Sequence, residues 1–121
     1  MHSLKNQSFP ARLKFALAGI LAGLRAEYSL RVHLLALCAA LLVLILTRPE
    51  ALWWALIALA AAAVIAAELF NTAIEHLVDH LHPEIHPNIR IVKDCAAAAV
   101  LIAALGALGV GAAFIVHLWR H

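Results

Sequence analysis

Charged side chains are scarce in this sequence. Of its 121 residues, Asp, Glu, Lys and Arg make up only 13%, whereas apolar residues make up 65%. Soluble domains have about 25% charged and about 45 to 50% apolar residues, so this shortage excludes an ordinary soluble domain and indicates an integral membrane protein. The formal net charge is only +2 and the basic residues are spread out, so no nucleic-acid partner is expected.

Glycine and cysteine are also rare. The five glycines form no glycine-rich phosphate loop, which excludes the nucleotide-binding fold of soluble kinases. Cys38 and Cys95 lie in or beside apolar runs, without the spacing of a metal or redox motif, and we interpret them as packing thiols. The chain is short enough for residues 1–121 to form a single domain.

Three long apolar runs dominate the rest of the sequence. They cover residues 32–47, 52–67 and 95–119. A membrane-spanning helix needs about 20 mostly apolar residues, so each run predicts a span. With their flanking residues, we expect transmembrane helices at about residues 28–47, 50–80 and 94–119. The fold class is therefore an all-α membrane protein.

The second of these helices is predicted to extend beyond the bilayer. No Gly or Pro interrupts it before Pro83, and we expect a polar loop over residues 80–92. Thirty residues at 1.5 Å each give roughly 45 Å, against a hydrocarbon core of roughly 30 Å. One end of this helix must project into the aqueous phase.

An amphipathic helix is predicted at about residues 9–26. Pro10 suits the first turn of a helix, and a narrow apolar stripe follows, with basic residues off it. We interpret this segment as a helix on the membrane surface. A signal peptide is an alternative, but Leu24-Arg25-Ala26 is a poor cleavage site. A fourth span is disfavoured, because the apolar part has only about 10 of the roughly 20 residues needed.

The basic residues predict the orientation in the membrane. In a three-span arrangement, one side carries Lys5, Arg12, Lys14, Arg25, Arg31, Arg90 and Lys93, and the other carries Arg48 and Arg120. By the positive-inside rule, the N-terminus is cytoplasmic and the C-terminus is outside. All three tryptophans then fall at the outer interface, where aromatic side chains are enriched; they are Trp53, Trp54 and Trp119.

A polar stripe follows the second apolar run without a break. At 100° per residue, five side chains fall within an arc of about 100° on one helix face: Glu68, Asn71, Thr72, Glu75 and Asp79. The helix rise places Glu68 roughly 24 Å from Leu52, near the inner edge of the hydrocarbon, and Glu75 roughly 35 Å from Leu52, in the headgroup or water layer. Ionisable groups at such depths mark a functional site or an internal polar contact.

Several charged residues should meet at the cytoplasmic interface in this arrangement: Glu27, Glu68, Glu75, Asp79, Lys93 and Asp94. Carboxylates one turn apart suit a Mg²⁺ ion that is otherwise held by phosphate and water, and a lysine suits phosphate. A carboxylate deeper in the layer suits a general base. The alternative is that these groups only pair with one another and hold a bundle together, and the i, i+4 spacing of Glu27 and Arg31 fits either hypothesis.

The histidines form a second candidate cluster. His76, His80, His82 and His86 have spacings that zinc or nickel sites use. However, two of them lie in a proline-broken loop and no cysteine is near. We interpret them as solvated residues at the interface.

The stripe also carries a recognisable pattern. ExxNTAIExxxD over residues 68–79, followed by Lys93-Asp94 and an alanine-rich continuation, resembles the signature of the prokaryotic diacylglycerol kinase and undecaprenol kinase family. These proteins are small integral membrane lipid kinases, unrelated to soluble kinases. Gly19, Glu27, Arg31 and His33 also have compatible spacing, so the resemblance covers nearly the whole chain.

The resemblance implies a homotrimer of three-span protomers in the bacterial inner membrane, with active sites between protomers. It implies transfer of the ATP γ-phosphoryl group to a membrane lipid alcohol, with Mg²⁺ on the nucleotide. By position, Glu68 matches the catalytic base, and Glu27 and Glu75 match the metal ligands. Asn71, Lys93 and Asp94 match positions that line the nucleotide and phosphate site.

The lipid substrate stays open between diacylglycerol and undecaprenol. His33 and the loop at residues 86–94 resemble the undecaprenol branch, but Tyr28-Ser29 departs from the Arg-Asn common there. Two other functions remain as alternatives: a small proton or cation conductor, and a non-catalytic assembly subunit. Residues 52–67 contain no acid or base, which disfavours a conducting path through the outer half of the membrane.

Substitution of Glu68 tests the role that the resemblance assigns to it. Glu68→Gln removes the basic carboxylate and keeps the size of the side chain, so we expect turnover to fall about 10²- to 10⁴-fold while ATP binding persists. Lipid phosphorylation and nucleotide binding, measured on the same preparation, separate the two effects. A variant that phosphorylates lipid at the parental rate would contradict the assignment.

Overall fold

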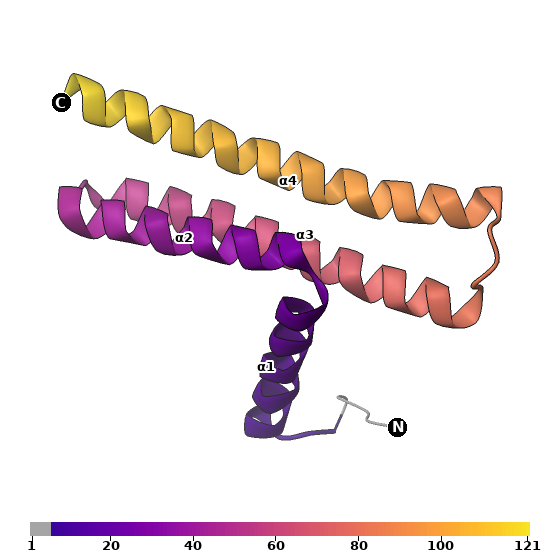
Figure 1. Cartoon of the computed structure of the whole chain (residues 1–121). Coiled ribbons are helices and arrows are strands. Elements are labelled where there is room, and N and C mark those ends of the chain that lie inside the picture. Colours follow the sequence, from indigo (N-terminus) through magenta and orange to yellow (C-terminus); the bar gives the residue numbers. More distant parts are fainter. Residues whose placement is uncertain (1–5) are drawn as a thin grey trace.

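The computed structural model describes residues 6–121, which fold into helices joined by short connections. They are α1 (Phe9–Ala26), α2 (Tyr28–Thr47), α3 (Ala51–Leu81) and α4 (Pro87–Arg120). Figure 1 shows α2, α3 and α4 running alongside one another, with α1 at a steep angle to them. The last three are long and apolar enough to cross a membrane, which confirms the prediction of an all-helical protein with three candidate spans. Lys5, which was counted in predicting the orientation, lies outside the described residues.

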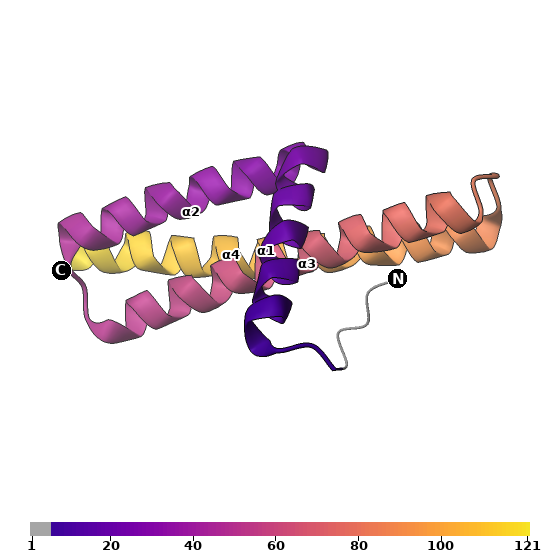
Figure 2. The ribbon, with the colours of Figure 1, turned by 90° about the horizontal axis from the view of Figure 1, so that it is seen from below.

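The helix α1 begins and ends through local backbone contacts. Ser8 caps it, because its Oγ accepts a bond from the Ala11 N–H at 3.4 Å, and Pro10 occupies the first turn. At the other end, Glu27 is extended, and its N–H donates to the Gly23 carbonyl at 2.9 Å. One non-helical residue therefore redirects the chain from α1 into α2, and Figure 2 shows the resulting crossing of α1 over the spans.

The last turn of α1 packs closely against the spans at Gly23. This glycine is buried, and a Cβ on it would lie 2.7 Å from Leu69 Cδ2 and 3.0 Å from Leu30 Cδ2. Leu30 belongs to α2 and Leu69 to α3, so α1 is held at the point where these two helices meet. The apolar stripe of α1 is not buried within the chain, since Leu13 and Leu17 remain exposed.

A small core joins the spans at the end where α2 turns into α3. Leu44, Ile57 and Phe114 are buried together, one from each span. The Trp53 ring packs on Phe114 with 5.2 Å between ring centroids. The turn itself uses Arg48, whose left-handed backbone (φ 46°) lets its N–H bond the Leu44 carbonyl at 2.8 Å.

The helices α3 and α4 form a long hairpin that extends past α2 (Figure 1). The prediction that the last helix begins near residue 94, after a loop over residues 80–92, is wrong, because α4 begins at Pro87. His86 caps it, with Nδ1 accepting the Asn88 N–H at 3.1 Å, and Pro87 takes the first helical position, where its missing N–H costs nothing. Lys93 and Asp94 therefore lie inside a helix.

Most large apolar side chains of the spans face outward. Exposed examples on the three spans are Leu35, Leu46, Leu59, Phe70, Leu101 and Leu108. A helix that is apolar on every side belongs in hydrocarbon or against other apolar helices. The exposed surface thus agrees with the membrane assignment.

A larger side chain at Gly23 should weaken the attachment of α1. We expect Gly23→Val to be less stable than Gly19→Val by about 1 to 3 kcal/mol, because position 23 has no space for a Cβ whereas position 19 has no atom within 4 Å of one. Both changes put the same residue into the same helix, so the difference in helix propensity cancels. Thermal unfolding in detergent, followed by circular dichroism, measures the difference. Equal melting of the two variants would contradict the packing.

Candidate active site

Glu68 is a buried carboxylate on a membrane-spanning helix. It lies on α3 and is only 2% exposed. A charge removed from water is costly unless polar groups surround it. Its surroundings therefore indicate what the side chain does.

Two side chains from the start of α2 contact the two oxygens of this carboxylate. The Ser29 hydroxyl donates to Glu68 Oε2 at 2.8 Å. His33 Nδ1 lies 2.7 Å from Glu68 Oε1, but the ring N–H does not point at the oxygen, so this is a close polar contact and not an aligned hydrogen bond. Ser29 and His33 are four residues apart and thus share one face of α2. Ser29 was not among the residues predicted for the site, although this spacing of polar residues was a usable signal.

Two other side chains on α3 contact backbone carbonyls. Thr72 Oγ1 donates to the Glu68 carbonyl at 2.9 Å, and His76 Nδ1 lies 2.9 Å from the Thr72 carbonyl. Asn71 Oδ1 is buried. Among the described residues, neither it, Glu68 Oε1 nor His33 Nδ1 has an aligned hydrogen-bond partner. Such atoms are rare in folded proteins. Glu68 Oε1 and His33 Nδ1 face each other, so Asn71 Oδ1 is the one of the three that has no polar contact among the described residues.

An apolar groove of about 630 Å³ leads to this polar group between the three spans. His33 is its most polar wall residue, and its other walls include Ala36, Ala40, Ala60, Val64, Ala107 and Gly111. Glu68 is not a wall residue, so the imidazole separates it from the groove. The groove suits an apolar chain whose polar end reaches His33.

Glu27 and Glu75 are two predicted site residues whose carboxylates have no partner among the described residues. Both are half-exposed, and neither side chain makes a hydrogen bond or ion pair with any residue from 6 to 121. The hypothesis that Glu27 pairs with Arg31 is wrong: Arg31 Nη1 donates to the Leu24 carbonyl at 3.2 Å, and its guanidinium lies 5.9 Å from the Tyr28 ring. The i, i+4 argument fails because Glu27 precedes α2 and is extended.

These carboxylates fit part of a magnesium site. The described residues contain no group of three His, Cys, Asp or Glu side chains that could hold a metal ion. Mg²⁺ bound with a nucleotide needs only one or two carboxylates, because phosphate and water complete its shell. Glu27 and Glu75 are chemically suited to such a role.

Lys93 and Asp94 are engaged in exposed ion pairs. Lys93 Nζ donates to Asp79 Oδ1 at 2.6 Å, and Arg90 Nε lies 3.8 Å from Asp94 Oδ2. Exposed pairs are worth about 0 to 1 kcal/mol, so an anionic ligand can displace them. Asp79 is about three turns, or roughly 16 Å, along α3 from Glu68. Within one chain, Lys93 and Asp94 are therefore not brought to Glu68.

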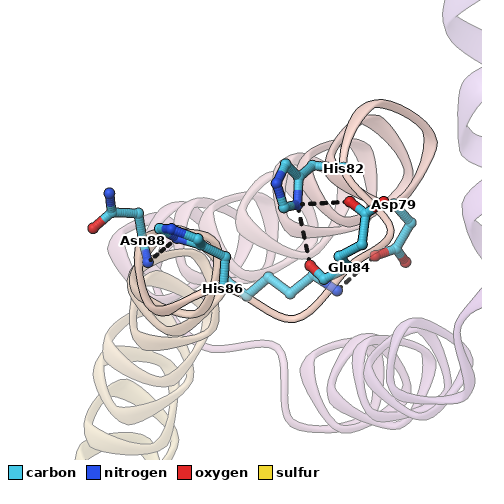
Figure 3. Close-up of polar contacts among 6 residues, drawn as sticks. Asp79, His82, Glu84, His86 and Asn88 are labelled. Atoms are coloured by element: carbon cyan, nitrogen blue, oxygen red, sulfur yellow. Dashed lines mark hydrogen bonds and ion pairs between the residues drawn. The ribbon is translucent and has the colours of Figure 1, made fainter.

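The histidines at the tip of the hairpin stabilise the loop (Figure 3). His82 Nδ1 lies 3.1 Å from the Glu84 carbonyl and 3.6 Å from Glu84 Oε2, while His86 caps α4. No metal-binding group is found among these histidines in the described part of the chain. These contacts are local to the loop and to the start of α4, and a position of the four histidines at the membrane interface stays a prediction.

The fold and site define an integral membrane protein with a buried polar group beside an apolar groove. The sequence matches the model of a known family, prokaryotic diacylglycerol kinase, over residues 14–115. It is 35% identical over 99 residues to a diacylglycerol kinase of Synechocystis sp., covering 81% of this chain and 57% of that protein. It is 36% identical over 87 residues to an undecaprenol kinase of Bacillus subtilis, covering 72% of this chain and 71% of that protein. The chain belongs to the prokaryotic diacylglycerol kinase family, a family of lipid kinases.

Removal of the Ser29 hydroxyl should disturb the buried carboxylate. Ser29→Ala leaves Glu68 Oε2 without its donor, so we expect a loss of stability of about 1 to 3 kcal/mol. Ser29→Thr keeps the hydroxyl and serves as the matched control. Denaturant unfolding of both variants in detergent measures the difference. If Ser29→Ala were as stable as Ser29→Thr, the hydrogen bond would have no net effect.

Proposed function

We propose that this chain transfers the γ-phosphoryl group of ATP to the hydroxyl of a membrane lipid alcohol at the cytoplasmic face. One observation carries the proposal: a buried carboxylate, Glu68, contacts His33, which is the polar wall residue of an apolar groove. A lipid has the matching chemistry, with an apolar tail for the groove and a hydroxyl for the polar end. Membership in a lipid kinase family supports the same activity.

Glu68 supplies the general base of this site. Ser29 holds Oε2, which fixes the plane of the carboxylate and directs Oε1 to the side of His33. As the lipid oxygen bonds to the γ-phosphorus, its proton is drawn toward this carboxylate, and ADP leaves. Such reactions depend mainly on positioning and on stabilisation of charge. Exclusion of water around Glu68 strengthens both effects.

The nucleotide lies along the part of α3 that extends toward the cytoplasm. Glu27 and Glu75 would hold Mg²⁺ bound with the nucleotide, and the ion would supply neutralisation of phosphate charge. Asn71 lines the site one turn from Glu68, while Lys93 and Asp94 meet more distant parts of the nucleotide. Lys93 exchanges its exposed partner Asp79 for phosphate, as a lysine at a solvated site does at little cost.

The proposed location is the inner membrane, with the N-terminus in the cytoplasm and the C-terminus outside. The distribution of basic residues supports this orientation. The exposed leucines of α1 support a position on the membrane surface, with the apolar stripe in the acyl region. The exposed apolar spans support assembly as a homotrimer, and the open faces of Gly106 and Gly109 on α4 give room for close helix packing.

A phosphorylation assay tests the activity and identifies the lipid. We expect γ-labelled ATP to transfer label to diacylglycerol, giving phosphatidic acid, or to undecaprenol, giving undecaprenyl phosphate, when both are offered in detergent micelles. Chelation of Mg²⁺ should abolish the transfer, and Glu27→Gln and Glu75→Gln should each raise the Mg²⁺ concentration needed for half-maximal rate. Glu50→Gln, which makes the same change at the opposite end of α3, is the control.

The assay also separates the alternatives. If no lipid alcohol were labelled, the lipid kinase proposal would fail and a non-catalytic subunit would be favoured. Ion flux in liposomes without ATP would favour a conductor.

A further inference from the structure

His33 occupies the position between the groove and the buried carboxylate. Its side chain is 31% exposed and lines the groove, whereas the Glu68 side chain is 3% exposed and does not. A hydroxyl group that enters from the groove therefore meets the imidazole before it meets the carboxylate. The arrangement gives His33 direct access to the substrate.

The two nitrogens of the ring have different surroundings. Nδ1 faces Glu68 Oε1 at 2.7 Å, and Nε2 has no hydrogen-bond partner among the described residues. A carboxylate beside Nδ1 favours the tautomer with the proton on Nδ1, which leaves the lone pair of Nε2 free to accept a proton. The contact is short but not aligned, as is common before substrate binds, and a rotation of the ring aligns it. Ser29, bound to Oε2, prevents the carboxylate from turning away.

We propose that His33 is the residue that contacts the lipid hydroxyl and accepts its proton, with Glu68 orienting the imidazole and stabilising its charged form. This inference rests on the proposed lipid kinase activity and refines the role of Glu68. The base at this site is then a histidine–carboxylate pair, held together by contacts between α2 and α3.

Proton transfer to His33 accompanies phosphoryl transfer to the lipid. The O–H bond of the lipid breaks, and its proton passes to Nε2 of neutral His33. The lipid oxygen bonds to the γ-phosphorus of ATP, while the bond between that phosphorus and the bridging oxygen of the β-phosphate breaks. ADP leaves with the electrons of the broken bond. The imidazolium, paired with the ionised Glu68, returns its proton to water when the product departs.

Substitution of His33 by asparagine tests the role of Nε2 separately from the role of Nδ1. Its amide nitrogen replaces Nδ1 and keeps the contact with Glu68, but no atom replaces Nε2. We expect His33→Asn to lower kcat about 10²- to 10⁴-fold and to leave the KM for ATP unchanged. Rates are measured on the full chain in detergent micelles, with the lipid that the parental protein phosphorylates. His121→Asn, the same change at the exposed end of the chain, is the matched control and should keep the parental rate.

Recovery of activity by added imidazole distinguishes a proton-accepting role of His33 from a purely structural role. His33→Ala leaves space beside the groove, so we expect free imidazole to restore part of its rate in a concentration-dependent manner. Glu68→Gln, which retains the ring, should not respond. Thermal unfolding of each variant shows whether a loss of rate reflects loss of the fold.

The outcomes separate this inference from the proposed function. Loss of kcat in His33→Asn together with recovery of His33→Ala by imidazole supports it. A parental rate in His33→Asn, with Glu68→Gln inactive, overturns it and leaves Glu68 as the direct base of a lipid kinase. Loss of kcat without recovery by imidazole assigns His33 a structural role and also overturns it. A parental protein that labels no lipid contradicts the proposed function itself.

Discussion

A carboxylate enclosed among apolar helices is the constraint on which this structure depends. Glu68 lies on a helix that is otherwise apolar for many residues, and its charge is tolerable only with polar groups at contact distance. Ser29 and His33 meet this need, so the start of α2 must pack against the middle of α3. The last turn of α1 then closes over the same junction, because Gly23 leaves room for Leu30 and Leu69. One electrostatic requirement thus sets the relative positions of three helices.

The same contacts explain why the polar site lies beside the start of α2. The spans pack loosely, with a few buried apolar residues near the turn from α2 to α3 and a groove between them. At the start of α2, polar contacts replace apolar packing as the link between α2 and α3. Beyond Glu68, α3 and α4 continue without α2 and carry carboxylates and a lysine in exposed positions. The site can therefore be reached through the apolar groove on one side and from the exposed polar part of α3 and α4 on the other.

The spans and the polar stripe were predictable because length and apolarity alone decide them. Helix periodicity placed Glu68 and Glu75 on one face of α3, which is continuous through both residues, and their depths in a membrane stay a prediction. Two errors came from local geometry. Pro87 either breaks or begins a helix, and the outcome depends on whether His86 caps it, which composition does not reveal. The spacing of Glu27 and Arg31 implies a pair only within one continuous helix, and α2 begins one residue too late. The contact of Ser29 with Glu68 joins residues 39 positions apart, so it depended on the packing of two helices.

Glu27 is a candidate metal ligand and is also the residue that connects α1 to α2. It is the one extended residue between two helices that meet at a steep angle, so its backbone sets that angle. Its carboxylate is also free of partners among the described residues. A cation held by this side chain restrains the joint itself, as ligands do when they bind at a hinge. The proposed Mg²⁺ contact at Glu27 would thereby also affect the angle between α1 and α2.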